Sequence, residues 1–371
     1  MVRRAHVLLV GVVLLAAACS GGSSGGSGSA PDEEAGPETT TTTALAIGPD
    51  VAPVPSAGCD PQGTPPVDGR VEVPDAPGAP DGEPRWYLLA APDDARPDEP
   101  LPVVLDLHGY SAGAEVQAAT SRLGGLADRE RLLAVAPQGS GPVPAWGLTP
   151  TTDGDDFAFL VGVLDELEAR HCVDRARVFA TGLSNGAMMT TVLACTLAGR
   201  IAAIGPVAGL TEVDPCDPSR PVPLLTVHGT EDGFLSFEGG IGDDALDLPA
   251  PDGSGRTIRD LVAAGAPGFD DPGVLEGPSI PELAATWARR NGCSREVTTR
   301  ALAPDVEERT WNCPPDGDTV LVVIEGGGHT WPGSELMAAV EEIVGPTTFE
   351  VDATELLWEF FREHARPPAD P

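Results

Sequence analysis

The sequence predicts an α/β domain with a mostly parallel central sheet flanked by helices. Short apolar runs alternate along the chain with longer helical patterns. Most of the short runs are apolar throughout, which is typical of strands that are buried on both faces of a parallel sheet. The expected strands are Trp86–Ala90, Val103–Leu107, Leu132–Ala136, Val178–Thr181, Ala203–Val207, Leu224–His228 and Val320–Ile324.

Three of the expected helices carry capping signals at their N-termini. Asp155 and Asp156 precede a helical pattern, where carboxylates can accept hydrogen bonds from free N–H groups. Ser279 and Glu282 have the spacing of a capping box, and Pro281 between them suits the first helical turn. The helices expected are Phe157–Glu168, one that continues through Arg290, and one from Ala353 to about His364, where Asp352 and Glu355 form a similar box.

The N-terminus has the pattern of an export signal. A positive region with Arg3 and Arg4 precedes the apolar run Val7–Ala18, which is too short to span a bilayer. Cys19 follows small residues directly, and residues 1–19 therefore resemble a bacterial lipoprotein signal in which Cys19 is lipidated. An ordinary secretory signal that is cleaved after the small residues is the alternative. An exported protein, anchored to the membrane through lipid only, is expected.

Composition predicts how the rest of the chain is organised. Residues 20–58 are rich in Gly, Ser, Thr and Pro, with too few apolar side chains to repay ordering, so a flexible linker is expected. Residues 59–367 are expected to form one folded domain. Residues 238–278 are acidic and rich in Gly, Pro and Asp, which indicates an insertion loop rather than a second domain.

Charge excludes one class of partner. The net charge is −35, and every basic side chain other than histidine is an arginine. A surface this acidic repels phosphate backbones, so no nucleic-acid partner is expected.

Six cysteines remain after Cys19, an even number that indicates three disulfides in an exported chain. Six cysteines allow fifteen sets of pairings. Short loops favour Cys195–Cys216 and Cys293–Cys313, which leaves Cys59–Cys172. No C-x-x-C spacing suggests zinc, and no metal is expected.

Two stretches of the predicted domain fit G-x-S-x-G, the pattern of a nucleophile elbow between a strand and a helix. Gly182–Gly186 lies between the expected strand Val178–Thr181 and helix-compatible residues, so Ser184 is the predicted nucleophile. Gly109–Gly113 follows another strand, but no helix is expected directly after Ser111.

A serine nucleophile needs a base and an acid that orients the base. His329 follows three glycines after the last expected strand, and Asp232 follows the strand before it, with Glu231 as a rival acid. The order Ser184, Asp232, His329 is that of the α/β-hydrolase fold. These three residues are therefore the predicted catalytic triad.

The Gly109–Gly113 stretch is predicted to complete the oxyanion hole. One N–H comes from the residue after the nucleophile, Asn185, and the other from a loop that follows an earlier strand. Tyr110 is the predicted second donor and Ser111 the alternative. His108 and His228 each end a strand at a His-Gly pair, and both are expected to hold loops rather than to act as the base.

These motifs resemble the PHB depolymerase/feruloyl esterase-like group of secreted α/β-hydrolases. The resemblance rests on "LHGY" at 107–110, "APQG" at 136–139, "VDRARVFATGLSNGAMM" at 173–189, "CDPSRPVPLLTVHGTED" at 216–232 and "GGGHTWPG" at 326–333. It implies a single-domain α/β-hydrolase that cleaves carboxylic esters with Ser184, Asp232 and His329, without a cofactor. Ala187 departs from the Ser-Asn-Gly-Gly elbow that is frequent in the group, and the segment after Asp232 is longer and more acidic than expected.

The expected substrates are hydroxyalkanoate oligomers, feruloyl or acetyl esters of polysaccharides, or short acyl esters. Trp146, Phe234, Phe237 and Trp331 can form an apolar substrate surface, or they can belong to the core. Two other functions stay open: a non-catalytic surface lipoprotein that binds a glycan or lipid on this fold, and a peptidase of the same fold.

Overall fold

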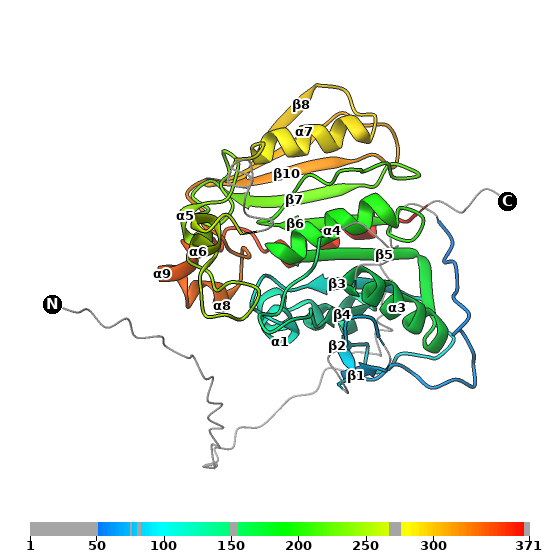
Figure 1. The fold of residues 1–371 in the computed structure, drawn as a ribbon. Coiled ribbons are helices and arrows are strands. Elements are labelled where there is room, and N and C mark those ends of the chain that lie inside the picture. Colours follow the sequence, from blue (N-terminus) through cyan, green and yellow to red (C-terminus); the bar gives the residue numbers. More distant parts are fainter. Residues whose placement is uncertain (1–50, 75, 80–82, 149–154, 267–275, 367–371) are drawn as a thin grey trace, which may run out of the picture. The chain divides into compact units, whose positions relative to one another are not determined.

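The computed structural model describes residues 51–74, 76–79, 83–148, 155–266 and 276–366, which contain one ten-stranded sheet (Figure 1). The strand order is β1-β2-β4-β3-β5-β6-β7-β10-β9-β8. The strands are β1 (Gly69–Val73), β2 (Arg85–Ala90), β3 (Leu101–Leu107), β4 (Leu133–Pro137), β5 (Val173–Leu183), β6 (Ala203–Val207), β7 (Leu224–Gly229), β10 (Thr319–Ile324), β9 (Val306–Trp311) and β8 (Val297–Ala303).

The six strands from β4 to β10 along this order are parallel, and both edges of the sheet are antiparallel. Strands β3, β4, β6, β7 and β10 are buried along their whole length, as expected for apolar strands that are covered on both faces. This is the α/β-hydrolase fold, and the predicted fold class is confirmed. All seven expected strands are present.

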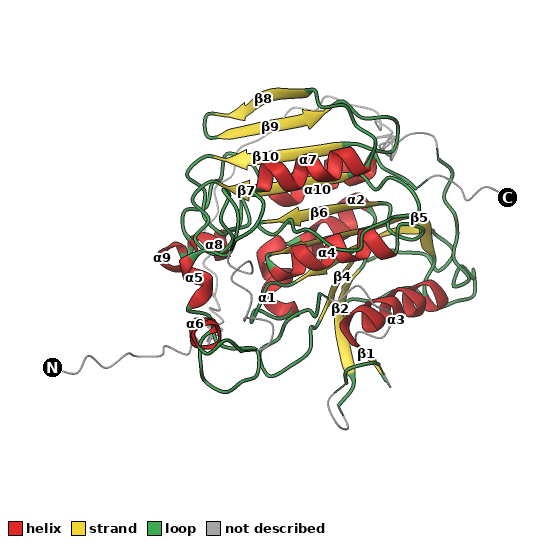
Figure 2. Ribbon diagram, turned by 45° about the horizontal axis from the view of Figure 1, so that its top comes forward, coloured by secondary structure: helices red, strands yellow, loops and turns green. Residues whose placement is uncertain are grey.

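Helices cover both faces of the sheet (Figure 2). One apolar cluster joins α3, α4 and α7 to one face, and a second joins α10 to the other. The helices are α1 (Ala114–Ser121), the 3₁₀-helix η1 (Leu123–Leu126), α2 (Ala127–Glu130), α3 (Asp155–Arg170), α4 (Asn185–Thr196), α5 (Asp243–Leu246), α6 (Ile258–Ala263), α7 (Ile280–Arg290), α8 (Glu335–Ala338), α9 (Glu341–Val344) and α10 (Ala353–Arg362). No helix among the described residues has the length and apolarity to cross a membrane.

The capping predictions meet mixed outcomes. Ser279 and Glu282 form the expected reciprocal capping box at α7. Asp352 caps α10, but Glu355 pairs with Arg129 rather than completing a box. Asp155 and Asp156 lie inside the first turn of α3 rather than before it.

The two disulfides that short loops favoured, Cys195–Cys216 and Cys293–Cys313, are present, and so is the remaining pair, Cys59–Cys172. Cys59–Cys172 fixes the N-terminal part of the described chain to the start of β5. The other two close loops of about 20 residues. Cys195–Cys216 joins the end of α4 to the loop that follows β6, and Cys293–Cys313 joins the residues after α7 to those after β9. Each contributes on the order of 2–4 kcal/mol to stability.

The predicted end of the linker at residue 58 is wrong. The Val54 N–H donates to Asp174 Oδ1 at 2.9 Å, and the Ser56 N–H donates to the Val173 carbonyl at 2.9 Å. The backbone of residues 54–56 therefore pairs with the start of β5. Composition could not predict this pairing, because main-chain N–H groups of the segment make the contacts. The signal segment, Cys19 and linker residues 20–50 lie outside the described residues.

The predicted insertion has short helices of its own. Within its described parts, residues 238–266 and 276–278, it contains α5 and α6. Isolated bridges join Leu235 to Ile241 and Pro249 to Thr257. It forms no second sheet in these described parts.

Candidate active site

Three polar side chains follow the carboxyl ends of neighbouring parallel strands. Ser184 follows β5, Asp232 follows β7 and His329 follows β10. Strands β5, β6, β7 and β10 are adjacent in the sheet, so their carboxyl ends lie at one edge (Figure 1). Ligands bind at this edge in open α/β sheets.

Ser184 occupies the junction between strand and helix that its motif predicts. Its backbone has φ 57° and ψ −120°, a strained conformation for a side chain with a Cβ atom, and α4 begins at the next residue. Gly182 and Gly186 lie where backbones meet: a Cβ on Gly186 would be 2.0 Å from the Leu107 carbonyl oxygen, and one on Gly182 would be 2.4 Å from it. Both glycines are therefore required by the approach of β5 and α4 to the end of β3.

Asp232 contacts His329 directly. Asp232 Oδ2 lies 2.7 Å from His329 Nδ1, and the two residues are only 6% and 7% exposed. Glu231, the rival acid, is exposed, and its N–H donates to the Gly327 carbonyl at 2.9 Å. Of the two acids, only Asp232 is placed to orient the imidazole.

The environment of Asp232 favours its charged form. Burial opposes ionisation, but the charge on His329 and hydrogen bonds from His228 and His329 outweigh it, so the pKa of Asp232 lies below its usual range. Oδ1 also accepts N–H bonds from Phe234 at 2.8 Å and from Leu235 at 2.9 Å. Asp232 is therefore a buried carboxylate that carries charge.

Within the described residues, no hydrogen bond joins Ser184 Oγ to His329. Such bonds are often long in unliganded enzymes and shorten when substrate binds. The two residues share the strand edge, and the Ser184 N–H is held by the Val207 carbonyl of β6 at 3.0 Å.

The loop after β3 packs against Ser184. Gly109 packs against it, because a Cβ on Gly109 would lie 3.5 Å from Ser184 Cβ. Asn185 is the first residue of α4, so its N–H has no acceptor inside the helix. The Ser111 N–H already donates to the Pro144 carbonyl at 2.8 Å, whereas the Tyr110 N–H has no partner among the described residues. This favours Tyr110 over Ser111 as a donor to substrate.

A side-chain network that the sequence did not predict supports these donors. Asn185 Oδ1 accepts the Trp146 N–H at 2.7 Å, and Asn185 Nδ2 donates to the Trp146 carbonyl at 3.2 Å. Trp146 Nε1 donates to the His108 carbonyl at 2.9 Å. The network ties the loop after β3 to the N-terminus of α4. The motifs "LHGY" and "LSNG" contain two of its members, but nothing in the sequence indicated that Trp146 joins them.

His108 holds a loop, as expected. Its Nδ1 lies 2.8 Å from the Gly109 carbonyl, and its Nε2 accepts the Gly139 N–H at 2.8 Å. Burial lowers the pKa of His108 to about 4, so the ring is neutral at pH 7. Both ring nitrogens are used, which leaves none for catalysis.

The predicted substrate surface is wrong for both tryptophans. Trp331 is completely buried and donates to Thr354 Oγ1, and Trp146 is 3% exposed. Aromatic residues beside a site motif can pack loops as well as bind substrate, and here both indoles are buried in loop packing. Phe234 is also mostly buried, but it stacks on His329 with ring centroids 4.8 Å apart. Phe237 is mostly buried and lies beside the His228 ring.

The insertion contacts two loops of the site. The Tyr110 hydroxyl donates to the Pro249 carbonyl at 2.8 Å, and Gly242 N–H donates to the Phe234 carbonyl at 2.8 Å. A cavity of about 240 Å³ lies between the insertion, α4 and the loop that follows Asp232, and its lining includes Met188, Leu210, Leu235, Ile241 and Leu283. The insertion therefore borders the region beside the first turn of α4.

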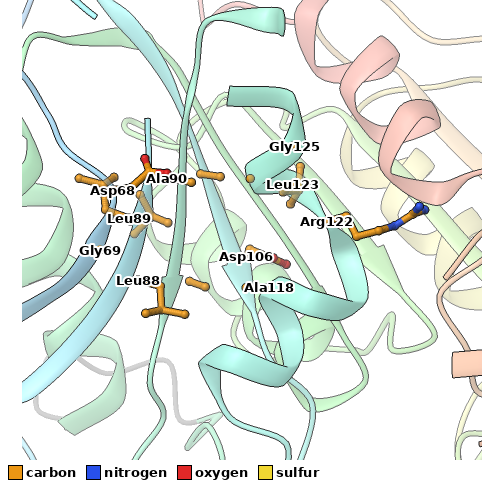
Figure 3. Close-up of a pocket in the computed structure, with 14 residues that line it drawn as sticks. Asp68, Gly69, Leu88, Leu89, Ala90, Asp106, Ala118, Arg122, Leu123 and Gly125 are labelled. Carbon is orange, nitrogen blue, oxygen red and sulfur yellow. The ribbon is translucent and has the colours of Figure 1, made fainter. Parts of the chain in front are cut away.

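A second cavity, of about 320 Å³, lies away from these residues, between α1, η1 and strands β2, β3 and β4 (Figure 3). Asp106 of β3 lines it, and the Asp106 carboxyl accepts hydrogen bonds from Gln117 Nε2 at 2.7 Å and Ser121 Oγ at 2.5 Å. None of Ser184, Asp232 and His329 lines this cavity.

Comparison with known proteins agrees with these motifs. A family model described as esterase PHB depolymerase matches residues 86–214. A putative esterase, NocK, from Nocardia uniformis subsp. tsuyamanensis is 30% identical over 274 residues, covering 68% of this chain and 72% of that protein. The chain belongs to the PHB depolymerase esterase family. The family resemblance inferred from the motifs is confirmed.

Other members of the family are larger than the matched region. Feruloyl esterase B from Piromyces equi is 26% identical over 258 residues, covering 66% of this chain and 42% of that protein. A bifunctional acetylxylan esterase/xylanase from Neocallimastix patriciarum is 30% identical over 157 residues, covering 42% of this chain and 23% of that protein. The chain thus spans less than half the length of these two relatives. Among solved structures, an acetyl xylan esterase from Aspergillus awamori gives a TM-score of 0.49 at 16% identity, covering 73% of this chain and 98% of that one.

Proposed function

We propose that this protein is an exported serine esterase that hydrolyses carboxylic esters through an acyl-enzyme. The observation that supports it most is the contact between Asp232 and His329. This contact lies at the carboxyl ends of the parallel strands, where the strained Ser184 also lies. The contact assigns the proton on His329 to Nδ1, which donates to the carboxylate. Nε2 is then the basic nitrogen that can accept the serine proton.

The reaction follows from these roles. Ser184 Oγ attacks the ester carbonyl carbon as His329 Nε2 takes its proton, and the carbonyl oxygen becomes an oxyanion. The N–H groups of Tyr110 and Asn185 stabilise that oxyanion, each by about 3 kcal/mol. The tetrahedral intermediate then breaks its bond to the alcohol oxygen, which receives the proton from His329.

Water completes the cycle. It attacks the acyl-enzyme while His329 Nε2 takes one of its protons, and the second tetrahedral intermediate expels Ser184, which regains a proton from His329. The products are a carboxylic acid and a free enzyme. Every proton in this sequence passes through His329, and no cofactor is needed.

The ester itself is proposed from the relatives. Those named above are a feruloyl esterase and an acetylxylan esterase, so feruloyl or acetyl esters of polysaccharides are the first candidates. Hydroxyalkanoate oligomers and short acyl esters are the others. The acidic surface argues against nucleic acid as a partner.

Export and lipid anchoring at Cys19 are part of the proposal. The signal pattern of residues 1–19 supports them, and three disulfides suit an oxidising compartment. Labelled palmitate should be incorporated into the protein in a bacterial host, and Cys19→Ser should abolish the incorporation. Export of an unlabelled, shortened protein would instead indicate an ordinary cleaved signal.

Labelling of the nucleophile tests the esterase function. A fluorophosphonate should modify Ser184 covalently in the wild type and in Ser111→Ala, and should leave Ser184→Ala unmodified. Ser111→Ala retains its backbone N–H, so it should also keep ester hydrolysis within about threefold, whereas Ser184→Ala should lose on the order of 10⁴-fold or more.

A panel of substrates separates the alternatives. Nitrophenyl acyl esters, feruloyl esters, acetylated xylan and hydroxybutyrate oligomers should be compared with a matched nitroanilide. A folded protein that is neither labelled nor active would indicate the non-catalytic binding protein. Faster cleavage of the amide than of the ester would indicate a peptidase.

A further inference from the structure

A second histidine contacts the carboxylate that orients His329. His228 is the penultimate residue of β7, and its side chain is fully buried. Its Nε2 lies 3.2 Å from Asp232 Oδ2 and 2.8 Å from the Leu235 carbonyl oxygen. The mechanism above gives His228 no part, yet the ring is placed against the acid of the triad.

The contacts of His228 determine where its proton lies. Nε2 faces a carboxylate oxygen and a carbonyl oxygen, which can only accept, so Nε2 must carry the hydrogen. Nδ1 is buried and has no hydrogen-bond partner among the described residues. A second proton on Nδ1 would be an unpaired buried donor, which is costly. His228 is therefore a neutral donor whose one Nε2–H is shared between the Leu235 carbonyl and, at a longer distance, Asp232 Oδ2.

With His228 included, both oxygens of Asp232 are fully engaged. Oδ1 accepts the N–H groups of Phe234 and Leu235, and Oδ2 lies 2.7 Å from His329 Nδ1 and 3.2 Å from His228 Nε2. Leu235 is held twice, because its N–H donates to Oδ1 and its carbonyl accepts from His228. The carboxylate cannot rotate without breaking at least one of these bonds.

We propose that His228 is a positioning residue for Asp232. It fixes the plane of the carboxylate and, through it, the imidazole of His329, and it shares the negative charge that burial disfavours. This proposal rests on the proposed esterase function, since His228 acts only through the pair Asp232–His329.

Two substitutions separate donation from packing. His228→Leu removes the donor at similar volume, and kcat for 4-nitrophenyl acetate should fall about 10- to 100-fold, the loss expected for a hydrogen bond to a charged group, with KM changed less than about threefold. His228→Gln places an amide N–H near the position of Nε2 and should recover most of that kcat. Equal losses in both variants would overturn the proposal.

A double-mutant cycle tests the route of the effect. In an Asp232→Asn background, His228→Leu should cost less than about threefold, because the carboxylate through which His228 acts is already gone. A loss that stays fully additive, at matched thermal stability, would mean that His228 only packs, and the proposal would fail.

A measurement on the wild type does not depend on any variant folding. ¹⁵N-labelled histidine spectra at pH 8 should show His228 as the Nε2–H tautomer. An Nδ1–H tautomer would overturn the proposal. This readout holds even if no ester is cleaved, so failure of the esterase function and failure of the positioning role are distinguishable.

Discussion

Two loops of this chain share the spacing G-x-S-x-G, and both follow buried parallel strands that are neighbours in the sheet. Both serines even have positive φ, 63° for Ser111 and 57° for Ser184. They differ in what comes next. After Ser184 a helix begins at once, whereas after Ser111 the chain continues through Ala112 and Gly113 before α1 begins.

The junction between strand and helix, rather than the G-x-S-x-G spacing, distinguishes the predicted nucleophile Ser184 from Ser111. Only Ser184 stands between β5 and α4, so the Asn185 N–H at the start of α4 has no hydrogen-bond partner among the described residues. At Ser111 the longer loop folds back, and the Ser111 N–H is used by Pro144. The first loop presents a nucleophile with a donor beside it, and the second offers only backbone.

Of the substitutions that test this difference between the two loops, we expect Gly186→Ala to have the largest effect. Alanine is a better helix former than glycine, so Gly186→Ala would be stabilising if nothing lay nearby. Its Cβ would instead lie 2.0 Å from the Leu107 carbonyl oxygen. We expect a loss of about 3 kcal/mol in the free energy of unfolding, and a large loss of ester hydrolysis as Ser184 and Asn185 shift.

Gly199→Ala is the matched control. A Cβ on Gly199 would meet no atom within 4 Å, and the residue has no positive φ, so this substitution should change stability by less than about 0.5 kcal/mol. Denaturant unfolding and nitrophenyl ester hydrolysis report both effects. A Gly186→Ala variant as stable and active as Gly199→Ala would contradict the role given to the elbow glycines.

Sequence patterns predicted the parallel part of the sheet because its strands are apolar along their whole length. They missed β1, β8 and β9, which lie at the antiparallel edges. The side chains of β8 are mostly exposed, and Val297–Ala303 contains Thr and Arg at positions where a buried strand would be apolar. The edge strand β8 is stabilised by main-chain pairing with β9. Main-chain pairing leaves no pattern of apolar side chains from which the strand could be predicted.

The same limit applies to the site. The order of Ser184, Asp232 and His329 along the chain predicted which residues reach the strand edge, and the contact between Asp232 and His329 agrees with it. The contacts of His228 with Asp232 and of Asn185 with Trp146 depend on how loops fold back. Such tertiary contacts leave no spacing or period in the sequence.

A subtler difference between the two regions lies in their buried carboxyls. Asp232 has histidines as partners, whereas Asp106, the penultimate residue of β3, is bonded to the neutral groups of Gln117 and Ser121. Burial therefore dominates at Asp106 and raises its pKa from 3.8 to about 7. One buried aspartate is held charged by its partners, and the other is held protonated below neutral pH.

Replacing Asp106 with asparagine tests whether burial raises the pKa of this carboxyl. Because the pKa of Asp106 is raised in the folded state, the unfolded chain loses its proton first as pH rises, so folding stability falls between about pH 4 and pH 7 and stays low above it. Asp106→Asn cannot ionise. The cost of burying the amide does not depend on pH, so the stability of Asp106→Asn relative to the wild type should rise by roughly 3 kcal/mol between pH 4.5 and pH 8.

Thermal and urea unfolding at the two pH values measure this difference. Asp98→Asn is the control, since Asp98 is about half exposed and its ion pair among the described residues is with the exposed Arg96. Its difference from the wild type should stay within about 0.5 kcal/mol at both pH values. If Asp106→Asn instead keeps a constant difference from pH 4.5 to pH 8, then Asp106 titrates alike in both states, and the neutral donors Gln117 and Ser121 offset the cost of burying its charge.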